Sequence, residues 1–110
     1  AEYLDTAGTP AVRRQDGDIT FDREVDRNYA ASADVTVIDA SPGRVITVRG
    51  AGSRCTVVWN PWIDKTRTLT DLPDGDYLKF VCVETANAWR DRITIAPGKT
   101  HTLATTIAVN

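Results

Sequence analysis

The sequence predicts an all-β protein with antiparallel strands, because short β-branched runs recur along the chain and helical periodicity is scarce. Turn sequences such as Asp16-Gly17, Asn60-Pro61 and Pro97-Gly98 separate these runs. The runs DVTVID, RVITVR and DRITIA alternate polar and apolar residues, which is typical of strands with one buried face. With 110 residues, 42% of them apolar, the chain fits a single β-domain over residues 1–110.

The strands expected in chain order cover residues 18–21, 34–39, 44–49, 54–59, 77–84, 91–96 and 101–109. The turn Ser41-Pro42-Gly43 separates the second from the third, and Gly50-Ala51-Gly52 separates the third from the fourth. The run VCVE is more continuously apolar than the others, so its strand is expected in the middle of a sheet. The longest interruption, residues 60–76, has room for one helical turn before Pro73 and is a candidate wall of a binding site.

Composition argues against several classes of partner. Because 13 basic residues face 15 acidic ones, the net charge is -2, and neither nucleic acid nor a membrane surface is expected to bind. The N-terminus AEYLDTAGTP lacks the parts of a signal peptide, and Cys55 and Cys82 lie in strand-like runs without metal-ligand spacing. Buried free thiols, a cytoplasmic location and no metal are therefore expected. The chain has no methionine, so we expect it to begin within a longer polypeptide or after a processing cut.

Glu84 is the first candidate for chemistry, since it follows the apolar run KFVCV. A carboxylate at the end of a buried strand is unfavourable unless water or a partner serves it. If its side chain faces a cavity together with Phe80 and Cys82, it could act as a general base. If it faces solvent, it is an ordinary strand end, and the residues alone leave both possibilities open.

Two further stretches could bind a ligand. Trp59, Asn60 and Trp62 combine flat apolar faces with an amide, the mixture that a sugar requires, although the indoles could equally pack the turn onto the sheet. The segment DREVDR, residues 22–27, is either a solvated edge strand or a segment that places Arg27 or Asp26 at the rim of a polar pocket. His101, the only histidine, is interpreted as a surface or hydrogen-bonding residue.

Taken together, VVWNPW, FVCVETAN and IAPGKTHTLATTI resemble the C-terminal part of the hexose-6-phosphate mutarotase family, the glucose-6-phosphate 1-epimerases. YLD and ITFDREVDRNY, near the N-terminus, resemble it as well. The resemblance implies the C-terminal portion of a β-supersandwich of the galactose-mutarotase type. It also implies interconversion of the α and β anomers of a hexose 6-phosphate, with no cofactor.

The resemblance assigns the general base to Glu84 and a sugar-binding role to Asp5, with Trp59, Asn60 and Arg27 as further substrate-binding candidates. The family's acid is a histidine upstream of the residues present here, so the chain alone is expected to be inactive or nearly so. Exposed strand edges are expected to cause self-association or to pair with the upstream part. Two alternatives stay open: a noncatalytic carbohydrate-binding β-sandwich and a structural β-domain without a ligand.

Overall fold

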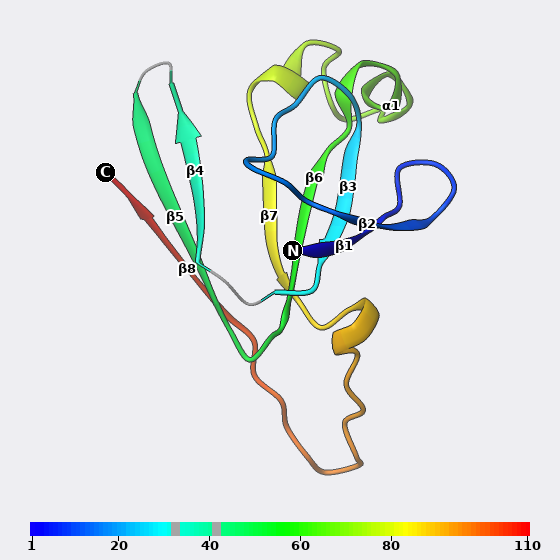
Figure 1. Cartoon of the computed structure of the whole chain (residues 1–110), viewed down its shortest axis with the longest axis vertical. Helices are drawn as coiled ribbons and strands as arrows, with labels where there is room; N and C mark the ends of the chain where they lie inside the picture. Colours follow the sequence, from blue (N-terminus) through cyan, green and yellow to red (C-terminus); the bar gives the residue numbers. More distant parts are fainter. Residues whose placement is uncertain (32–33, 41–42) are drawn as a thin grey trace. The chain divides into compact units, whose positions relative to one another are not determined.

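The computed structural model describes residues 1–31, 34–40 and 43–110 (Figure 1). These residues form two compact units, which we describe separately. Unit 1 contains Ala1–Tyr29 and Val57–Cys82, and unit 2 contains Ala30–Thr56 and Val83–Asn110. The described elements are mostly strands with one short α-helix, so the all-β prediction is confirmed. The predicted turn at Ser41 and Pro42 lies outside the described residues.

One sheet has five strands in the order β2-β1-β3-β6-β7. Their bounds are Glu2–Asp5 for β1, Ala11–Arg14 for β2, Val25–Tyr29 for β3, Cys55–Asn60 for β6 and Cys82–Ala86 for β7. β1 pairs antiparallel with both β2 and β3. The last two strands, β6 and β7, each contain residues of both units.

The N-terminal half of this sheet differs from the sequence prediction. The strand expected at residues 18–21 is absent, β1 and β2 were not expected, and β3 was anticipated only in part, by the possible edge strand at residues 22–27. The edge strand expected at residues 22–27 is also wrong, since β3 begins at Val25 and lies between β1 and β6. The placement of VCVE in the middle of a sheet is wrong as well, because β7 comes last in the strand order of the described residues.

A small apolar core holds unit 1 together. It consists of Tyr3 on β1, Val25 and Tyr29 on β3, and Val58 on β6, all at most 6% exposed. The rings of Tyr3 and Tyr29 lie 4.9 Å apart between centroids in a tilted arrangement. Because Val25 and Tyr29 are four positions apart on β3, they point to the same face of the sheet, which is the face that this core covers. The side chains that alternate with them are only partly buried.

The helix α1, Trp62–Thr68, follows β6 at a sharp corner. Trp62 has a φ of 58°, a left-handed conformation that is uncommon for a bulky residue. The side chain of Asn60 compensates, since its Oδ1 accepts a hydrogen bond from the Trp62 backbone N–H at 2.9 Å. The helical turn predicted just before Pro73 is misplaced. Instead, α1 begins directly after Pro61, and the short 3-10 helix η1, Asp76–Leu78, follows Pro73.

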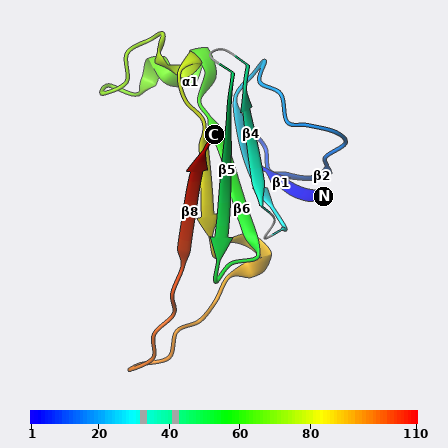
Figure 2. The same ribbon diagram turned by 90° about the vertical axis from the view of Figure 1, so that its left-hand side faces the viewer.

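Unit 2 contains an antiparallel sheet in the order β4-β5-β8 (Figure 2). Its bounds are Val35–Asp39, Arg44–Ala51 and Ala104–Val109, so the strands predicted at 34–39 and 44–49 are confirmed. The one predicted at residues 101–109 begins three positions later, and the one predicted at 91–96 is wrong. That segment instead follows the 3-10 helix η2, Trp89–Asp91, and Figures 1 and 2 show it running past the strand ends before returning to β8.

The β4-β5-β8 sheet presents an apolar face that is only partly covered. Cross-strand partners lie on the same face, and the register pairs Val48 with Ile107 and Ile46 with Val109. Val48 is 7% exposed, whereas Ile107 and Val109 are 63% and 60% exposed. The apolar pattern that predicted one buried face is therefore present in the strand sequence, but the β8 end of that face is open in this chain.

Candidate functional site

Glu84 lies in the middle of β7 and not at the strand end where it was predicted, and its side chain is exposed, as in the solvent-facing alternative. Its strand neighbours Val83 and Thr85 are partly buried. In the part of the chain that the structure describes, no hydrogen bond or ion pair engages the Glu84 carboxylate. The carboxylate is consequently available to accept a proton or a hydroxyl hydrogen bond from a ligand.

The backbone at Glu84 is held by contacts of the two residues that follow it. One residue onward, the Thr85 hydroxyl accepts a hydrogen bond from the Thr105 hydroxyl at 2.8 Å. Two residues onward, the Ala86 carbonyl accepts a hydrogen bond from the Ser53 hydroxyl. Thr85 also packs on Gly50 so closely that a Cβ at position 50 would lie 2.8 Å from the Thr85 Oγ1. Strand β7 thus presents Glu84 from a well-anchored position, which a group that transfers protons requires.

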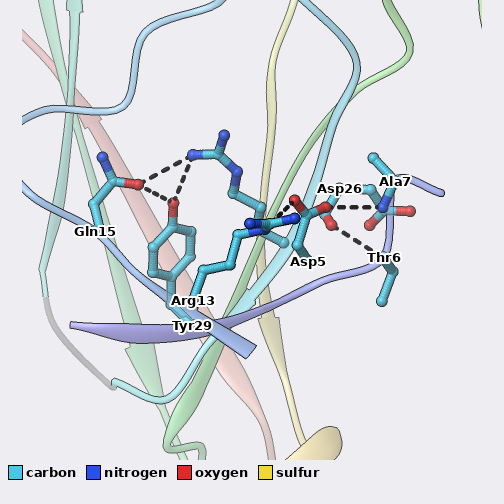
Figure 3. A network of polar contacts seen from close by, with 8 residues as sticks. Asp5, Thr6, Ala7, Arg13, Gln15, Asp26 and Tyr29 are labelled. Atoms are coloured by element: carbon cyan, nitrogen blue, oxygen red, sulfur yellow. Dashed lines mark hydrogen bonds and ion pairs between the residues drawn. The ribbon is translucent and has the colours of Figure 1, made fainter. Parts of the chain in front are cut away.

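Asp5 and Arg27 occupy directly opposed positions on β1 and β3 in unit 1. Asp5 accepts hydrogen bonds from the Ala7 backbone N–H at 3.0 Å and from Arg13 Nε at 3.2 Å (Figure 3). Since opposed residues of an antiparallel pair project from the same face, the carboxylate and the guanidinium form one polar surface. Asp5 was predicted from the sequence, whereas Arg13 was missed because β2 carries no apolar alternation that would have identified it.

Arg27 belongs to a hydrogen-bonded network with Gln15 and Tyr29 (Figure 3). Its Nη1 donates to Gln15 Oε1 at 3.0 Å and to the Tyr29 hydroxyl at 3.3 Å, and Tyr29 donates to the same Gln15 oxygen at 2.8 Å. The guanidinium also stacks over the Tyr3 ring, 4.9 Å from its centroid. Burial raises the pKa of Tyr29, so its hydroxyl keeps its proton as a donor at neutral pH. The network sets the direction of Arg27 and leaves part of its fork of donors for a ligand.

Trp59 and Asn60 are built into the β6 corner. Asn60 is 3% exposed, and its Nδ2 donates to the carbonyls of Tyr77 and Phe80 at 2.9 Å and 2.8 Å. Trp59 is partly buried, and its ring lies 5.9 Å from that of Phe80. With its amide fully engaged within the chain, Asn60 fixes the shape of the loop that follows β6.

His101 hydrogen bonds at the surface of unit 2, as its sequence context predicted. Its Nε2 lies 3.0 Å from the Gly52 carbonyl oxygen and 2.9 Å from Asn87 Oδ1. The free cysteines are Cys55, which is buried, and Cys82, which is partly buried. Burial raises the pKa of the Cys55 thiol, so the thiol remains protonated and packs as a buried, uncharged side chain. Among the described residues, no group of three or more His, Cys, Asp or Glu side chains could hold a metal ion.

The comparisons with known proteins identify a family. The sequence profile of aldose 1-epimerases matches residues 1–108, so the chain belongs to the aldose 1-epimerase family. Two relatives carry the name "Putative glucose-6-phosphate 1-epimerase": one from Cenchrus ciliaris, 36% identical over 89% of this chain, and one from Escherichia coli K12, 40% identical over 66%. The chain spans 30% and 25% of the length of these two proteins. No solved structure matches the chain significantly.

No helix in the described residues has the length and apolar character needed to cross a membrane.

Proposed function

We propose that this chain is the part of a hexose-6-phosphate 1-epimerase that supplies the catalytic base, Glu84. The observation that carries the proposal is the exposed, unengaged carboxylate of Glu84 on a strand anchored at Thr85 and Ala86. Membership of the aldose 1-epimerase family and the printed names of two relatives support the sugar-phosphate class of substrate.

The reaction needs a base and an acid at the same sugar ring. The base removes the proton of the C1 hydroxyl while the C1 to ring-oxygen bond breaks and an acid protonates the ring oxygen, which yields the open-chain aldehyde. Rotation about the C1 to C2 bond and closure in the reverse order give the other anomer. Glu84 acts as the base in this scheme. Because His101 is engaged with Gly52 and Asn87, the acid is assigned to a residue outside this chain.

The candidate substrate-binding residues belong to unit 1, and each is proposed from its contacts within that unit. Asp5 accepts hydrogen bonds from sugar hydroxyls, and Arg27, directed by Gln15 and Tyr29, donates to sugar or phosphate oxygens. Trp59 offers a partly exposed ring to the C–H face of a sugar. Asn60 contributes by holding the loop after β6 in place. The cytoplasm, where sugar phosphates are abundant substrates, is the location that we propose.

The experiment replaces the matching segment of the Escherichia coli relative with residues 1–110 and follows anomerisation of glucose 6-phosphate by NMR. We expect the isolated chain to give no rate above that of buffer, and the chimera to accelerate the reaction. Glu84→Gln in the chimera should lower kcat by about 10²–10⁴-fold, the usual contribution of a general base. Glu24→Gln makes the same chemical change elsewhere in the chain and should leave the rate unchanged.

Two results would contradict the proposal. Acceleration by the isolated chain, abolished by Glu84→Gln, would show that it contains its own acid. A chimera that binds glucose 6-phosphate but turns it over equally slowly with Glu84 or with Gln would favour the noncatalytic carbohydrate-binding alternative.

A further inference from the structure

A hollow in unit 2 is lined by none of the residues assigned to epimerisation. It has a volume of about 430 Å³ and is lined by Ser53, Arg54, Asn87, Asp91, Ile93 and His101. Volumes of roughly 300–1,000 Å³ are typical of pockets for small molecules. The hollow is formed by the turn after β5 and by the segment between β7 and β8, both within unit 2.

Hydrogen bonds fix how the polar groups face this hollow. Asn87 Nδ2 donates to the Gly52 carbonyl at 3.1 Å and to Asp91 Oδ2 at 2.9 Å, which sets the orientation of the amide. Asn87 Oδ1 is then the acceptor that faces His101. Because both partners of His101 Nε2 are oxygen acceptors, this nitrogen carries the proton, and in the neutral imidazole Nδ1 keeps a free lone pair.

Two further groups at the hollow have unused hydrogen-bonding capacity. Asp91 uses its Oδ2 for the Arg54 backbone N–H at 2.6 Å and for Asn87, while its Oδ1 has no partner among the described residues. The Arg54 side chain is exposed, and within the described ranges its guanidinium makes no hydrogen bond or ion pair. The hydrogen bonds that Asp91 accepts from the Arg54 backbone N–H and from the Asn87 amide lower the pKa of Asp91, so the carboxylate stays ionised at neutral pH.

The balance of charge and polarity selects the class of ligand. With Asp91 negative and Arg54 positive, these two formal charges cancel, so the pair gives no net attraction for an anion such as phosphate. The free groups are an acceptor oxygen, an acceptor nitrogen and a fork of donors, which match hydroxyl groups that both donate and accept. Ile93, 41% exposed, adds apolar surface for a C–H face.

We propose that this hollow, formed by Arg54, Asp91 and His101 beside Ile93, is a second binding site of the chain, for a neutral polyhydroxylated molecule of monosaccharide size. Asp91 Oδ1 and His101 Nδ1 accept hydrogen bonds from ligand hydroxyls, and Arg54 donates to ligand oxygens. Asn87 is a positioning residue, since it orients both His101 and Asp91. The site is independent of Glu84 and of the epimerisation proposed above.

The test titrates the ¹⁵N-labelled 110-residue chain with D-glucose and follows its amide, guanidinium and imidazole signals by NMR. Saturable shifts are expected at the Asn87 side-chain amide, the Arg54 Nε and the His101 ring, with a dissociation constant of about 1 mM. Arg54→Gln should weaken binding by about tenfold or more, because it removes the charged fork while no side-chain contact within the protein is lost. The matched control Arg92→Gln changes the same charge at an exposed residue that does not line the hollow and should leave affinity unchanged.

Each other outcome overturns the proposal. The absence of saturable shifts up to about 50 mM glucose, where a 1 mM site would be nearly full, would show that the hollow binds no sugar. Inorganic phosphate that shifts the same signals at lower concentration than glucose would make it an anion site. Equal weakening by Arg54→Gln and Arg92→Gln would place any binding elsewhere. Glu84→Gln should leave glucose binding at this site intact, which separates a failure here from a failure of the proposed epimerase function.

Discussion

Gly52 offers the most informative single substitution, because two separate physical effects meet at this residue. Its φ of 79° lies in the left-handed region, where a side chain costs roughly 1–2 kcal/mol. A Cβ at this position would also overlap the Thr102 carbonyl oxygen and lie 3.2 Å from its carbon. Since the obstacle is backbone, no side-chain rotation relieves the overlap, and the segment at Thr102 must move.

The movement would disturb hydrogen bonds that end on the same turn. The Gly52 carbonyl accepts from Asn87 Nδ2 and from His101 Nε2, each worth about 0.5–1.5 kcal/mol. With the conformational strain, the loss for Gly52→Ala is about 2–5 kcal/mol in the free energy of unfolding. This is a large fraction of the roughly 5–15 kcal/mol typical of a domain.

Gly98→Ala is the matched control, because Gly98 has nearly the same φ, 77°, and open space where its Cβ would lie. It should lose only the conformational part, roughly 1–2 kcal/mol. Urea unfolding of both variants, followed by tryptophan fluorescence, gives the two values. If Gly52→Ala loses no more than Gly98→Ala, the close approach of residue 102 to this turn does not stabilise the fold, and the argument fails.

Four further predictions concern other parts of the molecule. Val25→Ala removes two methyl groups from a side chain that is 1% exposed and should lower the free energy of unfolding, measured in urea, by about 1.5–3 kcal/mol. The same substitution at the exposed residue Val12 should change the free energy of unfolding little. Asn60→Ala leaves buried carbonyls without donors and should cost about 2–4 kcal/mol, whereas a loss below about 0.5 kcal/mol would show that water replaces the amide. The pKa of Asp91 is lowered from 3.8, so the Asp91 carboxylate stabilises the fold above pH 3.8. This stabilisation disappears as the pH falls through the folded-state pKa. Asp91→Asn should therefore flatten the decline in the free energy of unfolding measured in acid. The open apolar surface at Ile107 predicts self-association, so sedimentation velocity should show dimers or larger species that Ile107→Thr reduces, and a monomer at high concentration would contradict this.

The sequence was most informative where alternation and turn residues coincide. β4 and β5 follow polar and apolar alternation over most of their length, and both form where expected. β1 and β2 have four residues each, too short for a period to emerge, and they form because β3 and the core around Tyr3 give them a partner. The run DRITIA alternates like a strand but remains outside both sheets, since it has no neighbouring strand with which to pair in this chain.

Some residues of the candidate sites could be identified from the sequence, and others only from the folded structure. Glu84 could be selected from its place at the end of an apolar run and Arg27 from the charged segment at residues 22–27, and the resemblance to known epimerases added Asp5. Gln15 could not be selected, because a glutamine before a turn has no pattern of its own, and the pairing of β1 with both β2 and β3 explains its contact with Tyr29. The hydrogen bonds among His101, Asn87 and Asp91 could not be predicted from the sequence either. They form only once the segment between β7 and β8 returns to the turn at Gly52.

The contact between Thr85 and Thr105 has a consequence for the order in which the contacts next to Glu84 form during synthesis. Thr105 lies 20 residues after Thr85 in the chain, so Glu84 leaves the ribosome before Thr105 does, and Thr105 reaches Thr85 only when β8 pairs with β5. A nascent or prematurely terminated chain that ends before β8 therefore contains the carboxylate without the strand that steadies it. Pairing of strand β8, Ala104–Val109, with β5 is therefore required before the Thr85 hydroxyl gains this hydrogen bond.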